Sequence, residues 1–273
     1  MPFIQIIVLA LIQGITEFLP ISSSGHLILA PVVMGWHDQG LLTDMVTNVG
    51  TVTAVIIYFW RDVMRILRGT LDLARREDTA DARLALHIII GSIPIFAVGL
   101  VMKLLHLDDL IRSPMLVAVN AIVFGLLLYA ADAYGLFKRT MADMNWRSAA
   151  IIGTAQAFAL SPGTSRSGVT MTAARALGFT RPEAARFSFL LSIPANGAAS
   201  VLVIGDALKS GQPMTTDVII TGLLTFFVAL GTISLLMRWV RSMSFLPFVI
   251  YRMVLGGAIL GLIYSGTQLA AAP

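Results

Sequence analysis

Six long apolar segments constrain the fold of this chain more than any other feature of its sequence. They cover residues 42–60, 84–105, 114–133, 187–205, 217–237 and 243–264. Each is close to the roughly 20 apolar residues that a helix needs to cross the ~30 Å hydrocarbon core of a bilayer. Only 12% of the residues are charged, about half the share found in soluble domains. The sequence therefore predicts an all-α integral membrane protein with six transmembrane helices.

Four further apolar segments are too short to span a bilayer. They cover residues 3–16, 27–36, 148–160 and 169–179, and they come in two neighbouring pairs. Short apolar segments that are interrupted by proline, glycine or charge are typical of helices that enter the membrane and return to the same side. The sequence therefore predicts two re-entrant helical hairpins in addition to the six spans.

The two predicted hairpins share a sequence pattern. In the first, Gln13 precedes a Ser-Ser-Gly that ends at Gly25; in the second, Gln156 precedes an Arg-Ser-Gly that ends at Gly168. Both intervals are twelve residues, and three spans follow each hairpin. An odd number of spans turns the second half upside down, so we expect an inverted repeat of residues 1–133 and 134–273 within one membrane domain.

The distribution of Lys and Arg predicts the orientation in the membrane. Fourteen of the 19 basic residues lie in 61–83, 134–147, 175–186 and 238–241. The regions predicted on the opposite side contain Lys103, Arg112 and Lys209. Because basic residues concentrate on the cytoplasmic side, both termini are predicted to face outward. The excess of Lys and Arg over Asp and Glu, a net charge of +4, is explained by this orientation. It therefore does not indicate nucleic-acid binding.

The first hairpin carries a polar cluster in the stretch TEFLPISSSGH, residues 16–26. A carboxylate at membrane depth is costly unless it is paired, so Glu17 is a candidate functional residue. His26 follows Ser23 by three residues and shares its helical face. Ser22 and Ser24 are candidate substrate-binding residues, with helix capping as the alternative. The alternative for Glu17 is a purely structural role, in which it pairs with a neighbouring donor. The alternative for His26 is a structural histidine of the core.

The second hairpin carries the stretch PGTSRSG, residues 162–168. The planar donors of Arg166 match phosphate oxygens, although Arg166 could instead only balance Glu17. Hydroxyls, flexible backbone and helix N-termini add anion-binding groups. The candidate binding residues here are Gly163, Thr164, Ser165, Ser167 and Gly168. In the first long segment, Asp44 and Asn48 lie four residues apart on one helical face and are further candidates, with a membrane-boundary role as the alternative for Asp44.

The motifs EFLPISSSGH, PGTSRSG and FSFLLSIP resemble the signature regions of bacterial undecaprenyl-diphosphate phosphatases of the bacitracin-resistance type, and the resemblance covers essentially the whole chain. It implies a multi-pass enzyme of the bacterial inner membrane, with its site open to the periplasmic side. The enzyme removes the terminal phosphate of undecaprenyl diphosphate, recycles the carrier lipid for cell-wall synthesis and confers bacitracin resistance. The implied catalytic residues are Glu17, Ser23, His26 and Arg166.

The resemblance also implies a divalent cation, Mg²⁺ or Ca²⁺, for which Glu17 is the candidate ligand. Asn48 departs from the family pattern, in which glutamine or histidine is more frequent. Two mechanistic alternatives stay open: attack by Ser23 with His26 as proton acceptor, or attack by a metal-activated water. A homodimer is an open prediction. The alternative function is a transporter or flippase of polyprenyl phosphate, because inverted repeats around a midplane site are also typical of transporters.

Overall fold

The computed structural model describes residues 1–105, 113–134, 137–211 and 213–265, and the regular elements in these ranges are helices. In chain order they are α1 (Phe3–Thr16), α2 (Ser23–Met34), α3 (Gly40–Tyr58), α4 (Trp60–Ala74), α5 (Ala80–Leu104), α6 (Pro114–Ala133), η1 (Met141–Asp143), α7 (Trp146–Ala157), η2 (Phe158–Leu160), α8 (Arg166–Ala176), α9 (Arg181–Lys209), α10 (Thr216–Ser242) and α11 (Leu246–Tyr264). Arg112, one of the basic residues predicted outside, lies beyond the described residues.

Six of the helices are long and apolar enough to cross a membrane. They are α3, α5, α6, α9, α10 and α11, and they confirm the six predicted spans. The four predicted short segments correspond to α1, α2, α8 and the pair α7 and η2. Their starts follow local chemistry: Asn145 accepts a hydrogen bond from the amide of Ser148 at the start of α7, and Ser165 does the same for Gly168 in α8.

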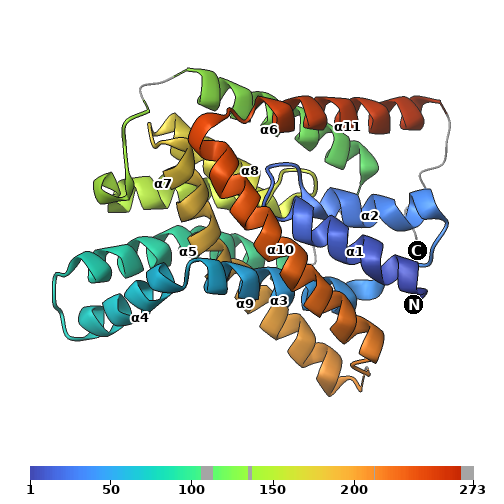
Figure 1. Cartoon of the computed structure of the whole chain (residues 1–273), viewed down its shortest axis with the longest axis horizontal. Coiled ribbons are helices and arrows are strands. Elements are labelled where there is room, and N and C mark those ends of the chain that lie inside the picture. The colour runs from blue at the N-terminus through green and yellow to red at the C-terminus, as the bar shows by residue number, and fades with distance from the viewer. Residues whose placement is uncertain (106–112, 135–136, 212, 266–273) are drawn as a thin grey trace.

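Helix α4 lies mostly within residues 61–83, a basic region for which the sequence predicts no helix. It packs against α5 at the lower left of Figure 1. Trp60, Met64, Leu67 and Leu71 are all exposed, and their spacing of three or four residues places them on one face. A search for long apolar segments overlooks such a helix, because charged residues occupy its other face.

The two short helix pairs are held against long helices in a similar way. Helix α1 packs on α10, and α7 packs on α5, while α6 and α11 lie side by side along the top of Figure 1. Glycines permit the close approach: a Cβ on Gly14 would lie 2.7 Å from a side-chain carbon of Val228, and a Cβ on Gly153 would lie 2.3 Å from the carbonyl oxygen of Gly91. This packing places the turns that follow α1 and η2 inside the molecule.

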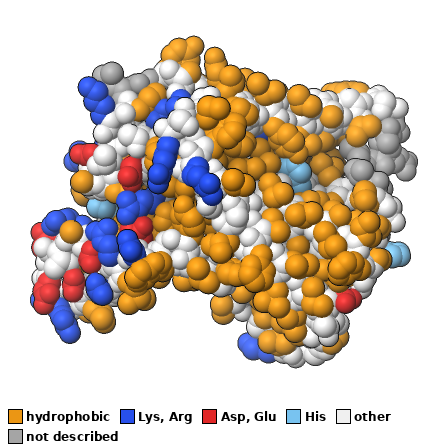
Figure 2. Space-filling view, viewed as in Figure 1, with side chains coloured by type: hydrophobic (Ala, Val, Ile, Leu, Met, Phe, Trp, Pro, Cys, Tyr) orange, Lys and Arg blue, Asp and Glu red, His pale blue; other side chains and the backbone are white. Residues whose placement is uncertain are grey.

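Charged and apolar side chains occupy different parts of the surface. Figure 2 shows Lys, Arg, Asp and Glu gathered at the left, around α4 and the neighbouring helix ends, and hydrophobic side chains covering most of the remaining face. Exposed apolar residues on the long helices include Val201, Phe227 and Val254. An apolar surface of this kind is what a lipid bilayer covers, so the chain is a multi-pass membrane protein.

Candidate active site

Glu17 is the centre of the polar site. It lies directly after α1, and only 8% of it is exposed. One carboxylate oxygen, Oε2, accepts hydrogen bonds from Ser23 Oγ at 2.5 Å and Gln13 Nε2 at 3.2 Å. The other, Oε1, accepts from Arg166 Nη2 at 2.9 Å and Asn196 Nδ2 at 2.8 Å. Four donors therefore stabilise one buried carboxylate, which offsets the cost of its burial.

Ser23 is the first residue of α2, and its hydroxyl donates a hydrogen bond to Glu17. The preceding residue, Ser22, has a positive φ of 74°, a conformation that non-glycine residues rarely adopt. This backbone directs the start of α2 toward the end of α1. A serine hydroxyl whose proton already points at a carboxylate is arranged as a nucleophile beside its proton acceptor.

His26 lies on the same helix but makes different contacts. Its Nδ1 is 2.7 Å from the carbonyl oxygen of Ser22, and its Nε2 is 2.5 Å from the hydroxyl of Tyr251. The ring also stacks on Tyr251 with centroids 5.6 Å apart. A carbonyl oxygen can only accept, so Nδ1 carries a proton, and in neutral His26 the remaining lone pair, on Nε2, faces Tyr251. The proton of Ser23 is therefore directed at Glu17 and not at His26.

Arg166 is the first residue of α8 and joins the two halves of the chain through Glu17. Its Nη1 also approaches the carbonyl oxygen of Ser188 at 3.4 Å, and its Nε has no partner among the described residues. The side chain is only 9% exposed. The guanidinium therefore contacts the carboxylate through one nitrogen, while Nη1 makes only a long contact and Nε is buried without a partner among the described residues.

The loop before α8 resembles the turn before α2. Ser165 has φ 69°, close to the 74° of Ser22. The hydroxyls of Ser22 and Ser24 are 3.2 Å apart, and those of Ser165 and Ser167 are also 3.2 Å apart. The two turns contact each other, because Ser167 Oγ donates to the carbonyl oxygen of Leu19 at 3.1 Å.

Arg252, from the middle of α11, fixes both turns. Its guanidinium donates to the carbonyl oxygens of Pro20 at 3.2 Å, Gly163 at 3.0 Å and Thr164 at 3.0 Å, and further to those of Asn120 and Ala121. The residue is completely buried. A buried arginine that satisfies carbonyl groups in both turns stabilises the irregular backbone on which Ser23 and Arg166 are mounted.

Two cavities meet at the Glu17–Ser23 pair. The first, about 490 Å³, is lined near the pair by Arg166 and Asn196, and elsewhere mostly by apolar residues of α5 and α9: Ile95, Phe96, Gly99, Leu100, Ala198, Ala199 and Leu202. The second, about 480 Å³, has more polar walls that include Asp38, Gln39 and Asp44. Glu17, Ser23, Ser24 and Asn48 line both. The site therefore accommodates a molecule with a polar head and an apolar tail.

Comparison with known proteins places this site in a family. The family described as bacitracin resistance protein BacA matches residues 6–258. The chain belongs to the BacA family. It is 47% identical to an undecaprenyl-diphosphatase of Ruegeria pomeroyi over 97% of this chain and 100% of that protein, and 45% identical to an undecaprenyl-diphosphatase of Erythrobacter litoralis over 95% and 99%. A protein of the same name from Maricaulis maris is 46% identical over 95% and 98%.

The predicted site residues of this BacA-family chain take two kinds of position. Those that line a cavity are Glu17, Ser22, Ser23, Ser24, Asp44, Asn48, Ser165 and Arg166. Those that do not line either cavity are His26, Gly163, Thr164, Ser167 and Gly168. The second group shapes the turns: Gly163 has φ +85°, and a Cβ there would lie 2.4 Å from the carbonyl oxygen of Val117. Asp44 Oδ1 accepts a hydrogen bond from Gln39 at 2.8 Å.

Four site residues were not predicted. Gln13 was noted only as a repeat marker, yet it donates both to Glu17 and to Asn48 Oδ1. Asn196 donates to the same two acceptors, and Arg252 holds the turns. Lys103 lines the first cavity. For Arg252 a signal was present, because an arginine inside an apolar span is a functional candidate by default. The side chain of Asn196 is short and neutral, and gives no comparable signal.

A divalent cation fits the donor chemistry of the second cavity in part. Its walls include the carboxylates of Glu17, Asp38 and Asp44, and Mg²⁺ and Ca²⁺ prefer oxygen ligands. Within the described ranges, no cluster of three or more His, Cys, Asp or Glu is arranged to hold a metal ion. A cation would therefore depend on one or two of these carboxylates together with oxygens of a bound phosphate, which is how Mg²⁺ is usually held.

Proposed function

We propose that this chain hydrolyses undecaprenyl diphosphate to undecaprenyl phosphate and inorganic phosphate, recycles the carrier lipid for cell-wall synthesis and confers bacitracin resistance. The observation that carries the proposal is the hydrogen bond from Ser23 to Glu17 beside Arg166, at the polar end of a cavity with apolar walls. The phosphatase name of full-length relatives at about 45% identity favours hydrolysis over the transporter alternative.

The chemistry of the first cavity supports one arrangement of the substrate. The isoprenoid chain lies against the apolar walls from α5 and α9, and the terminal phosphate lies between Ser23 and Arg166. Arg166, which lines this cavity beside its ion pair with Glu17, donates to the phosphate oxygens. These donors are fixed before the reaction and stabilise the charge of the transferring phosphoryl group.

The reaction proceeds in two displacements. Ser23 Oγ attacks the terminal phosphorus while its proton passes to Glu17; the bond to the bridging oxygen breaks, and undecaprenyl phosphate leaves and takes that proton. Water then attacks the phosphoserine and gives a proton to Glu17, and the Ser23 oxygen leaves and is reprotonated, which releases inorganic phosphate. The proton acceptor proposed here is Glu17 in place of His26, because of the hydrogen-bond partners of each.

The roles of the remaining site residues follow from their contacts. His26 holds α2 against α11 through Tyr251 and thereby positions Ser23. Gln13 and Asn196 hold Glu17 in the orientation that accepts from Ser23. A divalent cation held by Glu17 or Asp44 and the diphosphate would supply neutralisation of the substrate charge.

The decisive experiment is phosphate release from undecaprenyl diphosphate by the purified protein in detergent, where no membrane separates two compartments. Wild type releases inorganic phosphate, and Ser23→Ala loses at least about 10²-fold in turnover if Ser23 is the nucleophile. Binding of the lipid without release would support the transporter alternative. Substantial turnover by Ser23→Ala would assign the attack to a cation-activated water.

We also propose that the two halves form an inverted repeat with re-entrant hairpins in the bacterial inner membrane, with both termini and the site facing the periplasm. The support is the matching geometry of the Ser22 and Ser165 turns and the concentration of charge around α4. The N-terminal amine also contacts Asp217, at the start of α10, at 2.6 Å. Reporter fusions at the C-terminus and within 66–82 test this; a cytoplasmic C-terminus contradicts it. A homodimer stays a prediction.

A further inference from the structure

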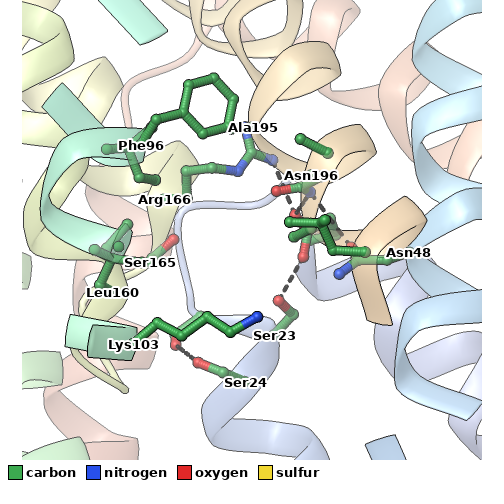
Figure 3. Close-up of a pocket in the computed structure, with 18 of the residues that line it drawn as sticks. Ser23, Ser24, Asn48, Phe96, Lys103, Leu160, Ser165, Arg166, Ala195 and Asn196 are labelled. Atoms are coloured by element: carbon green, nitrogen blue, oxygen red, sulfur yellow. Dashed lines mark hydrogen bonds and ion pairs between the residues drawn. The ribbon is translucent and has the colours of Figure 1, made fainter. Parts of the chain in front are cut away.

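A second cation faces Ser23 across the first cavity. Lys103 lies in the last turn of α5 and lines the cavity together with Phe96, Gly99 and Leu100 of the same helix. These residues are three or four positions apart and share one helical face. Figure 3 shows the side chain of Lys103 extending into the open space toward Ser23 and Ser24, with Arg166 on another side of that space.

Among the described residues, Lys103 is the charged side chain of the first cavity that has no ion-pair partner. The charged side chains on its described walls are Glu17, Arg166 and Lys103. Glu17 and Arg166 form an ion pair at 2.9 Å, whereas Lys103 forms no ion pair with a described residue. The described walls of the cavity therefore carry one positive charge more than negative ones. A lysine stem can run along an apolar surface while its ammonium reaches a polar group.

A lipid diphosphate presents two anionic groups at different distances from its tail. Arg166 is adjacent to the nucleophile and serves the terminal phosphate in the function proposed above. The phosphate that stays on the lipid has to lie between this terminal phosphate and the tail. Lys103 projects from the helix that supplies Phe96 and Leu100 to the tail groove, and its ammonium reaches toward Ser23. We propose that Lys103 binds the phosphate that remains on the lipid.

This assignment rests on the proposed function and gives it a substrate determinant. The ammonium stabilises the lipid phosphate as it departs, because negative charge accumulates there when the bond to the terminal phosphorus breaks. The same contact slows release of the product, because the lipid monophosphate retains the group that Lys103 holds. The affinity for the substrate and the inhibition by undecaprenyl phosphate should therefore both depend on Lys103. Inhibition by inorganic phosphate should not depend on it.

The chain supplies a matched control in Lys209. This lysine is also exposed and also lies in the last turn of a long helix, α9, where it has the same favourable position at a helix C-terminus. It lines neither of the two cavities. Any general effect of a positive charge at the membrane surface is therefore shared by the two lysines, and only the cavity contact distinguishes them.

The test compares wild type, Lys103→Met, Lys103→Arg and Lys209→Met in detergent. We expect Lys103→Met to raise the KM for undecaprenyl diphosphate and the inhibition constant of undecaprenyl phosphate by about tenfold or more, as expected for a lost charge-assisted hydrogen bond. The inhibition constant of inorganic phosphate should change less than about twofold. Lys103→Arg should restore the affinity, and Lys209→Met should match wild type.

Three results would overturn the assignment. They are an unchanged inhibition constant of undecaprenyl phosphate in Lys103→Met, a parallel loss of inorganic phosphate binding, or an equal effect of Lys209→Met. The dissociation constant of undecaprenyl phosphate, measured directly for wild type and Lys103→Met, tests the contact without any turnover. A wild-type protein that binds this lipid through Lys103 but releases no phosphate would therefore contradict the proposed hydrolysis and leave the Lys103 contact standing.

Discussion

Replacement of Arg166 by lysine separates a phosphate clamp from a simple counter-ion. Lysine keeps the positive charge, and its single nitrogen can take over the 2.9 Å contact of Nη2 with Glu17. It cannot replace the other two nitrogens, of which Nη1 reaches Ser188 only at 3.4 Å and Nε has no partner among the described residues. The substitution therefore removes the planar donor group beyond Nη2, without leaving the buried carboxylate uncompensated.

The expected loss follows from that count. Removal of one preorganised donor from an oxyanion site costs about 2.7–4 kcal/mol, which is about 10²–10³ in turnover. We expect a fall of this size in kcat for phosphate release from undecaprenyl diphosphate, with a smaller change in KM. Arg166→Ala is a poorer probe, because an unpaired buried carboxylate destabilises the fold by about 3–5 kcal/mol.

Two further measurements complete the Arg166 experiment. Thermal unfolding in detergent should show Arg166→Lys close to wild type. Arg186→Lys is the control, since Arg186 also pairs with a carboxylate, Asp62, but lies away from both cavities; its turnover should remain within about twofold of wild type. Turnover of Arg166→Lys near the wild-type value would refute the clamp and leave Arg166 as the counter-ion of Glu17.

The remaining predictions test the proton acceptor and the second turn. Glu17→Gln should lower kcat by about 10²–10⁴ through loss of the acceptor for Ser23, and His26→Ala by less than about tenfold; the reverse order would return the acceptor role to His26. Gly163→Ala should lower the free energy of unfolding by about 2 kcal/mol or more, because it combines a positive φ with a backbone clash. Thermal unfolding measures this loss, and Gly257→Ala, where an added Cβ meets nothing within 4 Å, should melt like wild type.

The long helices were predictable because a membrane span depends only on the hydropathy and length of its own segment. Residues 114–133 were predicted as a span, and α6 has the same bounds. Helix α4 was missed because its apolar residues form a stripe and not a continuous segment, so only a periodicity search would find it. The two turns were located because a buried acid and a buried arginine, Glu17 and Arg166, are too costly in lipid to be accidental.

The internal arrangement of the site was less predictable. The three-residue spacing of Ser23 and His26 predicts a shared face, but it does not say which other helix approaches that face. Tyr251, 225 residues away from His26 in sequence, takes the bond that the spacing suggested for Ser23. Asn196 depends in the same way on the packing of α9 beside α3. Unlike a charged residue, a neutral asparagine can lie in a membrane helix at little free-energy cost. The sequence alone therefore does not mark it as a site residue before its partner is known.

The contacts of Arg252 limit how this molecule can move. Alternating access requires one half of a repeat protein to rock against the other around a fixed site. Here one guanidinium is bonded to carbonyl oxygens in both turns, at Pro20 in the first turn and at Gly163 and Thr164 in the second. Rocking would strand these carbonyl groups in apolar surroundings, at several kcal/mol for each. Arg252 therefore ties the two turns together, so that Ser23 and Arg166 keep their relative positions while a lipid enters and leaves.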